Sequence, residues 1–474
     1  MHMNPTLPQN PADAPVPNVP TIFIIFGVTG DLAGRKLLPS LLSLYVKKQL
    51  PSKFAIVGFS RRPFTREEFR QLMRDNMKIK HGQFREEDVK HFLDHMSYEQ
   101  GNFDIPEAYD RLAEKLDLID KGWKQCSNKL FHLATPPSFY EVILDRLAES
   151  GLTIPCGGDL GWTRILIEKP FGNDTDTAKL LDKKLAKLFK EEQIFRIDHY
   201  LAKEALQNIL TFRFANSLFE PLWNRDFVDK VHIKLFEKID IEDRGPLYDN
   251  VGALKDVGQN HMLQMLALIA MEKPASFEAG PIRKERVKAL SKLRQITART
   301  VSATCVRGQY EGYMKERGVR PDSQTETFFR IEAHVDNARW KGVPFFLESG
   351  KAMFESRVEI DMYFSAEDSD IERQNVLTFR IQPDEGIKIR FWVKTPGYSN
   401  EVEPKTMKFR YSEMTDTAAL PDAYERVLHD AVVGDQTLFA DTDEVLAAWK
   451  FITPIMNVWR SIPLTFYKKG AKEV

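Results

Sequence analysis

A strand, a glycine-bearing turn and a helix follow one another near the start of the chain, and this order constrains the fold more than any other feature. Residues 21–26 read TIFIIF, a β-branched and aromatic run typical of a buried strand. The turn GVTGDLA occupies residues 27–33. Apolar residues then recur at helical spacing, at Leu37, Leu38, Leu41, Leu42 and Tyr45. The order predicts a unit of strand and helix from which parallel sheets are built.

The same alternation continues through the first 200 residues. Further strands are predicted at residues 54–59, 129–134 and 164–167, with helical patterns between them. Alternating strands and helices indicate a doubly wound parallel sheet of the Rossmann-like type, an α/β coenzyme domain.

The second half of the chain has a different periodicity. Apolar residues alternate with a period of two from about residue 228, most clearly at residues 326–335, 357–362, 376–381 and 387–393. This alternation is typical of antiparallel sheets with one buried face. We therefore expect an α+β domain with a large, mainly antiparallel sheet.

A chain of 474 residues is longer than one hydrophobic core usually holds, which supports two domains. We expect a coenzyme domain over residues 21–199 and a substrate-binding and dimerisation domain over residues 200–474. Residues 1–20 carry six prolines and no apolar periodicity, and are expected to form a disordered leader. The basic residues at 283–294 follow a helical pattern, and we expect them on a solvated helix face rather than in a binding patch.

Composition excludes little but points to an ordinary soluble, cytoplasmic protein. The 67 basic and 68 acidic residues leave a net charge of −1, so bulk charge favours neither nucleic acid nor a membrane as partner. The cysteines Cys126, Cys156 and Cys305 are widely separated and lack metal-ligand spacing. We expect them to be small buried apolar residues in a reducing compartment, and we expect no metal site.

The turn at residues 27–33 departs from the dinucleotide-binding pattern G-x-G-x-x-G, because its glycines stand at the first and fourth positions. Gly27 can make the tight turn, Gly30 can let the backbone approach a pyrophosphate, and Ala33 is small enough for the helix to pack on the strand. Thr29, Asp31 and Leu32 complete this candidate cofactor-binding turn. An ordinary strand-to-helix turn is the alternative interpretation.

The end of the second predicted strand indicates which dinucleotide is preferred. It reads Ser60-Arg61-Arg62, and no acidic residue occurs before Glu67. An acid here would bind the ribose 2′-hydroxyl of NAD, whereas a hydroxyl and guanidinium groups favour the 2′-phosphate of NADP. Ordinary surface arginines are the alternative. Ala134 and Pro136, at the end of a later strand, are expected beside the nicotinamide.

Residues 196–204 read RIDHYLAKE, a dense set of groups that transfer protons or bind anions. If a helix has begun by His199, then His199 and Lys203 share one helix face, and the first turn offers free N–H groups to a phosphate. A solvated helix start is the alternative.

Several motifs, in order along the chain, make it resemble the glucose-6-phosphate dehydrogenase family over nearly its whole length after the leader. Besides the turn at 27–33 and the segment at 196–204, they include IEKPFG at residues 167–172 and DVGQNH at residues 256–261, with a further similar segment at residues 423–449. Ala202 replaces a glycine of the family signature.

The resemblance implies NADP-dependent oxidation of glucose 6-phosphate at C1 to 6-phospho-D-glucono-1,5-lactone, the first step of the oxidative pentose phosphate pathway. The C1 hydroxyl must lose a proton as hydride leaves, and histidine has a suitable pKa for that base. The resemblance gives this role to His261, with Asp198 as its carboxylate partner and Lys169 as a cation between the sugar and the nicotinamide. Pro170 is a further cofactor neighbour. The implied substrate-binding residues are His199, Tyr200 and Lys203 at the phosphate, and Glu237, Asp256, Lys351 and Gln382.

Two points in this assignment depend on the resemblance. Asp256 and His261 are five residues apart, which would place them about 140° apart on an ideal α-helix. Ser356 stands at a position that is usually basic in the family, and Arg357 follows it. Neighbouring side chains of a strand point to opposite faces, so either the backbone shifts to present Arg357 or phosphate binding is weaker than usual.

Two other functions stay open. One is the same reaction on another hexose 6-phosphate, or with NAD also accepted, because Arg61 and Arg62 do not exclude NAD. The other is a non-catalytic NADP-binding sensor. The large sheet and the resemblance both predict a homodimer or a dimer of dimers.

Overall fold

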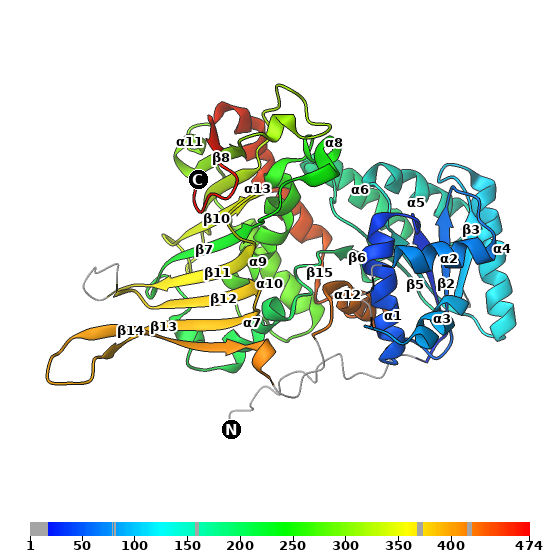
Figure 1. The fold of residues 1–474 in the computed structure, drawn as a ribbon, viewed down its shortest axis with the longest axis horizontal. Helices are drawn as coiled ribbons and strands as arrows, with labels where there is room; N and C mark the ends of the chain where they lie inside the picture. The colour runs from blue at the N-terminus through cyan, green and yellow to red at the C-terminus, as the bar shows by residue number, and fades with distance from the viewer. Residues whose placement is uncertain (1–17, 78, 80–81, 157–160, 367–372, 415–419) are drawn as a thin grey trace. The chain divides into compact units, whose positions relative to one another are not determined.

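The structure is a computed structural model that describes residues 18–77, 79, 82–156, 161–366, 373–414 and 420–474 (Figure 1). Most of the predicted leader lies outside these residues. The chain divides into two compact units. The first unit contains Met1–Gly172, Asp176–Ala202 and Pro421–Thr442, and the second contains Asn173–Thr175, Lys203–Leu420 and Asp443–Val474.

The first unit is built on a largely parallel sheet, sheet A, as the sequence predicts. Its strand order is β15-β6-β5-β4-β1-β2-β3, which contains the doubly wound order 3-2-1-4-5-6. All pairs are parallel except that of β15 with β6. The strands are β1 (Thr21–Phe26), β2 (Phe54–Ser60), β3 (Met96–Gln100), β4 (Asn128–Leu133), β5 (Thr163–Ile167), β6 (Ile194–Ile197) and β15 (Phe439–Ala440).

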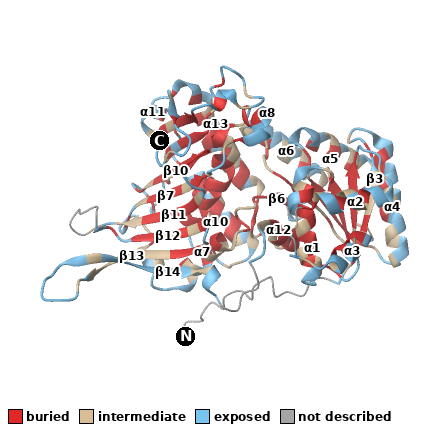
Figure 2. Cartoon of the chain, in the orientation of Figure 1, coloured by how far each residue is buried: buried red, intermediate tan, exposed pale blue. Residues whose placement is uncertain are grey.

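Helices lie on both faces of sheet A (Figure 1). Figure 2 shows buried strands in this unit and helices whose outer faces are exposed. Every residue of β1 is buried, because β2 and β4 flank this central strand. The helices are α1 (Leu38–Val46), α2 (Arg66–Asn76), α3 (Glu86–Asp94), α4 (Pro106–Trp123), α5 (Tyr140–Glu149), α6 (Thr175–Leu188) and α12 (Ala423–Val433), with a π-helix at Ala33–Leu37 and 3₁₀ turns at Pro137–Phe139 and Glu191–Gln193.

The first unit is not contiguous in sequence, in contrast to the predicted division at residue 200. The segment Pro421–Thr442 belongs to it, although residues 203–420 belong to the second unit. Within this segment, β15 extends sheet A by pairing Phe439 with Ile197 of β6. Glu425 of α12 receives hydrogen bonds from Lys47 (2.5 Å) and Ser43 (2.9 Å) of the α1 region. Such pairings join segments far apart in the chain, and local sequence patterns carry no sign of them.

The second unit contains the large sheet that the sequence predicts, sheet B. Its order is β14-β13-β12-β11-β7-β10-β9-β8-β16, and its pairs are antiparallel except β7 with β10 and β8 with β16. The strands are β7 (Val228–Phe236), β8 (Cys305–Tyr310), β9 (Phe328–His334), β10 (Pro344–Gly350), β11 (Arg357–Phe364), β12 (Val376–Gln382), β13 (Gly386–Lys394), β14 (Val402–Arg410) and β16 (Leu464–Tyr467).

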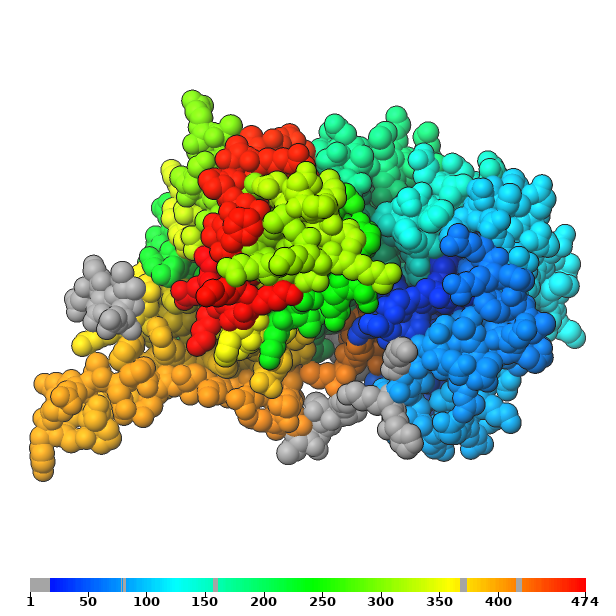
Figure 3. All heavy atoms as spheres, turned by 45° about the horizontal axis from the view of Figure 1, so that its top comes forward, coloured from blue at the N-terminus to red at the C-terminus, as the bar shows by residue number. Residues whose placement is uncertain are grey.

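Helices cover one face of sheet B (Figure 1). The β13–β14 hairpin projects from the unit, and β14 is almost wholly exposed (Figure 3). The helices are α7 (Glu204–Ala215), α8 (Gly245–Tyr248), α9 (Leu263–Ala270), α10 (Ala279–Ser291), α11 (Val301–Thr304) and α13 (Thr442–Val458), with a π-helix at Leu254–Met262. Shorter 3₁₀ turns lie at Glu220–Leu222, Glu242–Arg244, Tyr313–Lys315, Tyr411–Glu413 and Trp459–Ser461.

The basic residues at 283–294 do not all lie on a solvated face, so that prediction was wrong in part. Arg283 and Arg286 of α10 are buried. The Arg286 guanidinium makes two contacts with the Glu444 carboxylate, at 2.6 and 3.1 Å. Pairing with a buried carboxylate offsets the cost of removing the guanidinium from water, and this partner is far away in sequence.

The cysteine prediction was also wrong in part. Cys126 and Cys156 form a disulfide, whereas Cys305 is free and buried as expected. Burial raises the pKa of the Cys305 thiol to about 11. The disulfide joins the loops that lead into β4 and β5, which are neighbours in sheet A. The sequence alone did not indicate this pairing, because it depends on the adjacency of these two strands.

Breaking this disulfide is expected to destabilise the first unit. Its cysteines are 30 residues apart, and closing a loop of that length constrains the unfolded chain by up to about 3–4 kcal/mol. Reduction, or the double variant Cys126→Ser/Cys156→Ser, should therefore lower the Tm by several degrees in calorimetry. Cys305→Ala is the control for loss of a buried thiol without loss of a cross-link. Detection of three free thiols in the denatured, unreduced protein would contradict the disulfide.

Candidate functional site

The predicted coenzyme turn brings the ends of two adjacent strands of sheet A together. Gly27 has φ +79°, and a Cβ placed on it would lie 2.5 Å from the carbonyl oxygen of Ala134, at the end of β4. The turn closes by a hydrogen bond from Gly30 N–H to the Gly27 carbonyl (2.9 Å). The sheet reverses its strand order between β1 and β4, which is where such sheets bind their ligands. Gly27, Gly30 and Ala134 therefore lie where a dinucleotide is expected.

The helix after this turn begins with π-helical geometry. Ala33 is buried, as its packing role requires, but the tighter contact is made by Gly34, where a Cβ would lie 2.8 Å from the Asn76 carbonyl oxygen. The dinucleotide pattern ends one residue earlier, so the sequence did not indicate Gly34. Asp31 is exposed and pairs with Arg35 (2.7 Å) one helical turn later, while Leu32 is half-buried.

Hydroxyl groups gather at the end of β2, where the ribose is expected. Thr29 Oγ1 donates to Ser60 Oγ (3.3 Å), which lies 3.0 Å from the Tyr98 hydroxyl. Burial raises the pKa of Tyr98, so its hydroxyl stays protonated and donates to the Ser60 carbonyl (2.7 Å). Arg61 and Arg62 are exposed, and their guanidinium groups are accessible to a phosphate. Tyr98 was missed because it lies on β3, away from any motif.

The loop after β4 offers a polar group to a cofactor. Thr135 is buried, and its Oγ1 has no hydrogen-bond partner among the described residues. A buried hydroxyl without a partner is costly, so a ligand that hydrogen-bonds to it would be stabilised here. Pro136 beside it is exposed, and Lys169 and Pro170 after β5 are half-buried. The glycine cradle and this hydroxyl fit a bound nicotinamide dinucleotide.

The segment at 196–204 does not begin a helix at His199, so that prediction was wrong. β6 ends at Ile197, and α7 begins at Glu204. Asp198 makes a turn between them: its Oδ1 accepts from Tyr200 N–H and its carbonyl from Leu201 N–H, both at 3.0 Å. A short side chain that accepts from the backbone two residues later favours a turn over a helix. His199 and Lys203 therefore do not share a helix face.

Ala202 fits the backbone of this segment. Ala202 is buried, and its φ is not positive. An alanine therefore adopts this conformation without the strain that would require glycine. The segment divides between the units, since Asp198, His199 and Tyr200 belong to the first and Lys203 to the second.

In the second unit, Lys351 brings two of the predicted substrate-binding carboxylates together. Its ammonium is almost fully buried, pairs with Glu237 and lies 3.6 Å from Asp256. The Tyr248 ring lies 5.2 Å from the same nitrogen. Ala352, the next residue, has φ +53°, an uncommon conformation for a residue with a side chain. Backbone strain of this kind persists where surrounding contacts enforce it, often at functional sites.

His261 and Asp256 lie on a π-helix rather than on an ideal α-helix. The π-helix spans Leu254–Met262 and continues into α9. Hydrogen bonds from i to i+5 place residues five apart about one turn from each other, so the 140° separation of an α-helix does not apply. Gly258 permits this packing, since a Cβ there would lie 2.9 Å from the Phe329 ring. His261 is buried.

Glu326 holds the start of this helix, and no sequence motif indicates it. Its Oε1 accepts from Leu254 N–H (3.0 Å), and its backbone carbonyl accepts from Ala253 N–H (3.1 Å). A carboxylate at a helix N-terminus satisfies N–H groups that lack intrahelical partners and interacts favourably with the helix dipole. Burial raises the pKa of Glu326, and the Leu254 N–H opposes this effect.

Two more residues predicted to bind the substrate, Lys203 and Gln382, contact each other. Ser356 hydrogen-bonds to the neighbouring backbone. Lys203 Nζ donates to Gln382 Oε1 (2.7 Å). Ser356 Oγ accepts from Lys238 N–H (3.0 Å). Arg357 lies 3.3 Å from both Glu355 and Glu359, so carboxylates already balance its charge. These ion pairs hold the Arg357 guanidinium beside the two carboxylates.

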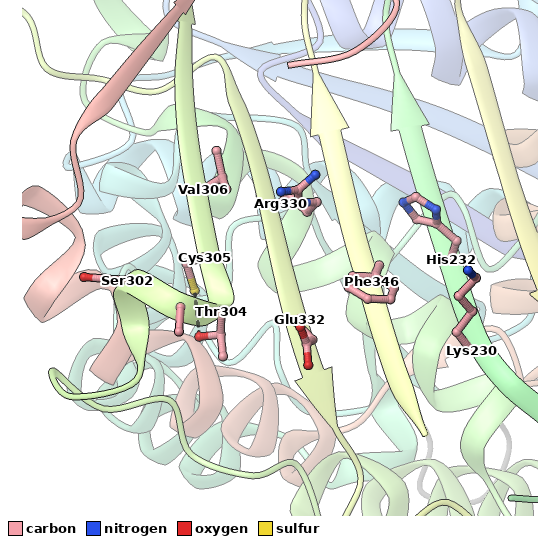
Figure 4. Close-up of a pocket in the computed structure, with 10 residues that line it drawn as sticks. Lys230, His232, Ser302, Thr304, Cys305, Val306, Arg330, Glu332 and Phe346 are labelled. Carbon is pink, nitrogen blue, oxygen red and sulfur yellow. Dashed lines mark hydrogen bonds between the residues drawn. The ribbon is translucent and has the colours of Figure 1, made fainter. Parts of the chain in front are cut away.

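A cavity of about 300 Å³ on sheet B contains none of the predicted site residues. Figure 4 shows His232, Phe346 and Arg330 on adjacent strands of its wall, with Cys305 and Thr304 on the other side. His232 Nε2 already bonds to Glu348 (2.7 Å). Within the described ranges, no helix is both long and apolar enough to cross a bilayer, and no group of three acidic, histidine or cysteine side chains is arranged to hold a metal ion.

Comparisons with known proteins agree with this arrangement. Residues 24–208 match the profile of the family "Glucose-6-phosphate dehydrogenase, NAD binding domain", and residues 210–473 match "Glucose-6-phosphate dehydrogenase, C-terminal domain". The glucose-6-phosphate 1-dehydrogenase of Aggregatibacter actinomycetemcomitans is 42% identical over 448 residues, which cover 92% of this chain and 90% of that protein. The corresponding protein of Chlamydia muridarum is 39% identical over 483 residues, which cover 97% and 93%.

A solved structure is also similar to the whole chain. It is a glucose-6-phosphate dehydrogenase in complex with its substrate glucose 6-phosphate, with 34% identity and a TM-score of 0.88. The similarity covers 96% of this chain and 95% of that one. The similar region therefore spans both sheets.

Adding a methyl group at Gly27 is expected to weaken dinucleotide binding. In Gly27→Ala the new Cβ would collide with the Ala134 carbonyl, so the loops after β1 and β4 must separate. We expect the Kd for NADPH, measured by fluorescence titration, to rise about tenfold or more. Gly151→Ala is the matched control, because Gly151 has φ +71° but open space around it. An affinity of Gly27→Ala equal to that of Gly151→Ala would show that the close approach of Gly27 to Ala134 does not matter for dinucleotide binding.

Proposed function

Because the chain belongs to the glucose-6-phosphate dehydrogenase family, we propose that it oxidises glucose 6-phosphate at C1, with NADP as the cofactor. The product is 6-phospho-D-glucono-1,5-lactone, so the reaction would begin the oxidative pentose phosphate pathway. The observation that carries the proposal is the match of both family profiles, which together span residues 24–473. The cluster of Lys351, Glu237 and Asp256 supplies the polar groups that a sugar requires.

His261 is the proposed general base. The C1 hydroxyl must lose its proton as C1 gives up hydride, and a neutral imidazole can take that proton near neutral pH. NADP, when bound, accepts the hydride from C1. Asp198 is the proposed partner of the imidazolium, orienting the ring and stabilising its positive charge. The π-helix and its Glu326 cap support the role of His261, because they hold its backbone in a fixed position.

The substrate phosphate is proposed to bind His199, Tyr200 and Lys203. Charge-assisted hydrogen bonds from these groups compensate the loss of water around the phosphate oxygens. Glu237, Asp256 and Gln382 can accept hydrogen bonds from sugar hydroxyls, and Lys351 keeps the first two side by side. Lys169 is proposed to lie between the sugar and the nicotinamide.

NADP rather than NAD is proposed because Ser60, Arg61 and Arg62 follow β2 where an acid would favour NAD. The pyrophosphate would approach the turn that contains Gly27 and Gly30. The hydroxyl network of Thr29, Ser60 and Tyr98 supports the proposal, since it fixes the Ser60 backbone beside the arginines. The arginines do not exclude NAD, which is proposed to bind as a poorer second cofactor.

We also propose a homodimer, or a dimer of dimers, through the open side of sheet B. Met407 and Phe409 of β14 are 55% and 39% exposed, and β14 is an edge strand. Exposed apolar residues on an edge strand favour contact with another chain. A cytoplasmic location is part of the proposal because the sugar phosphate is charged and does not cross a bilayer unaided. The Cys126–Cys156 disulfide would then be an exception to the rule that cytoplasmic thiols stay reduced.

The proposed reaction predicts saturable reduction of NADP that requires the substrate phosphate. Initial rates with glucose 6-phosphate should exceed those with glucose, and rates with NADP should exceed those with NAD. His261→Asn should lower kcat about 100-fold or more with little change in KM, because it removes the base but preserves the shape of the side chain.

Three results would contradict parts of this function. Tight NADPH binding without turnover on any hexose 6-phosphate would indicate the non-catalytic sensor. Turnover on a different hexose 6-phosphate would correct the substrate. A near-normal kcat in His261→Asn would remove this residue from the mechanism.

A cation at position 356 is expected to improve substrate binding. Ser356 is exposed, and Arg357 is balanced by Glu355 and Glu359. Ser356→Arg should therefore lower the KM for glucose 6-phosphate several-fold and change kcat less, because it adds a cation for the phosphate. Ser356→Ala is the control, since it removes the contact with Lys238 N–H without adding charge. An unchanged KM in the arginine variant would exclude any role of this position in phosphate binding.

A further inference from the structure

The carboxylate of Glu168 is buried directly before Lys169, and its hydrogen bonds come from separate parts of the first unit. Its Oε1 lies 3.1 Å from His132 Nε2, at β4, and its Oε2 accepts from the Tyr424 hydroxyl (3.2 Å), at α12. The backbone carbonyl of Glu168 accepts from the Tyr140 hydroxyl (2.9 Å), at α5. A carboxylate removed from water is stable only when its oxygens are hydrogen-bonded, so these donors fix its position.

Tyr424 and His132 can both donate a hydrogen bond to the Glu168 carboxylate. Burial, together with the Glu168 charge, raises the pKa of Tyr424, so its hydroxyl stays protonated and donates. The hydrogen bond to Glu168 assigns a proton to His132 Nε2, and Nδ1 of that ring has no hydrogen-bond partner among the described residues. Glu168, His132 and Tyr424 are each less than 10% exposed.

The segment that carries Lys169 is held at its other end as well. Gly172 has φ +86°, and a Cβ on it would lie 2.5 Å from the backbone nitrogen of Ala178 in α6. Phe171 is buried between these two points. The position of the Lys169 backbone is therefore determined by Glu168 on one side and by the contact of Gly172 with α6 on the other.

The Tyr424 ring contacts a second candidate substrate-binding residue. It is stacked on the His199 imidazole, with ring centroids 5.9 Å apart and planes at 16°. Offset stacking at this distance is favourable and restricts the rotation of the imidazole. One tyrosine thus contacts both the residue that precedes Lys169 and the side chain of His199.

Tyr424 is itself on a firmly anchored helix. Asp422 caps the start of α12 by accepting from Tyr424 N–H (3.0 Å) and pairs with Lys36 (3.1 Å). At the other end, Arg164 donates to the carbonyls of Ala431 (2.6 Å) and Val432 (2.8 Å), which have no intrahelical partners. Burial lowers the pKa of Arg164 to about 10, so the guanidinium remains charged near neutral pH.

From this geometry we propose that Tyr424 is a positioning residue that sets two substrate-binding groups at once. Its hydroxyl positions Lys169 through Glu168, and its ring positions His199 for the substrate phosphate. The inference rests on the proposed function, because Lys169 and His199 matter only if a sugar phosphate and a nicotinamide cofactor bind here. The alternative is that Tyr424 is an ordinary buried aromatic residue that contributes stability alone.

Two variants separate the hydroxyl from the ring. Tyr424→Phe keeps the ring and removes the donor to Glu168, and Tyr424→Leu removes both. Tyr109→Phe is the matched control, because Tyr109 is a fully buried tyrosine of α4 whose hydroxyl donates to the Phe103 carbonyl (3.0 Å). The readouts are the Tm, kcat, the ratio of kcat/KM for glucose 6-phosphate to that for glucose, and the calorimetric Kd of glucose 6-phosphate for the cofactor-free protein.

Different readouts are expected to change in the two variants. Tyr424→Phe should lower kcat about fivefold to tenfold. The ratio of kcat/KM for glucose 6-phosphate to kcat/KM for glucose should change less than about twofold. Tyr424→Leu should in addition lower that ratio, and weaken binding of glucose 6-phosphate, by about threefold to tenfold. Tyr109→Phe should lower the Tm by a similar amount to Tyr424→Phe and change neither kinetic quantity.

The proposal would be overturned if Tyr424→Phe retained the wild-type kcat and the wild-type ratio of kcat/KM for glucose 6-phosphate to kcat/KM for glucose, while its Tm fell as in the Tyr109→Phe control. This outcome does not require Tyr424→Leu to fold. Failure of the proposed function gives a different result, since the unaltered protein would then neither bind nor oxidise glucose 6-phosphate.

Discussion

The cost of burying a charge without a partner is the constraint on which much of this structure depends. Arg286 is buried with Glu444, and Lys351 with Glu237 and Asp256. In each case the partners are separated by many residues, so forming the pair fixes how distant parts of one unit pack. The same constraint applies at the buried carboxylate of Glu168. The ion pair within the core and the cluster at the proposed substrate site are therefore built in the same way.

Two π-helical segments show how local geometry serves a site. Ala33–Leu37 follows the coenzyme turn, and Leu254–Met262 carries Asp256 and His261. A π-helix is wider than an α-helix and less stable, so it persists where tertiary contacts support it. Glu326 at the N-terminus and Gly258 against the Phe329 ring provide such support for the second segment. The resulting register changes which side chains share a face.

The sequence predicted the elements well where the pattern was strong. The strand at residues 21–26, the glycine turn after it and the period-two strands of the second half are all found. The turn at Asp198 was misread as a helix start because the sequence does not show its two hydrogen bonds, one accepted by the Asp198 side chain and one by its backbone carbonyl. Gly34, Tyr98 and Glu326 were missed, since each acts through a contact with a residue distant in sequence.

The sequence by itself determined the types of secondary structure, the order of the two domains and the motifs that indicate the family. These follow from side-chain periodicity and turn chemistry, which are local properties. Only the tertiary structure decided the Cys126–Cys156 disulfide, the return of residues 421–442 to sheet A and the position of Tyr424 between Glu168 and His199. Each requires segments far apart in the chain to meet, and their proximity depends on strand order and on the pairing of buried polar groups.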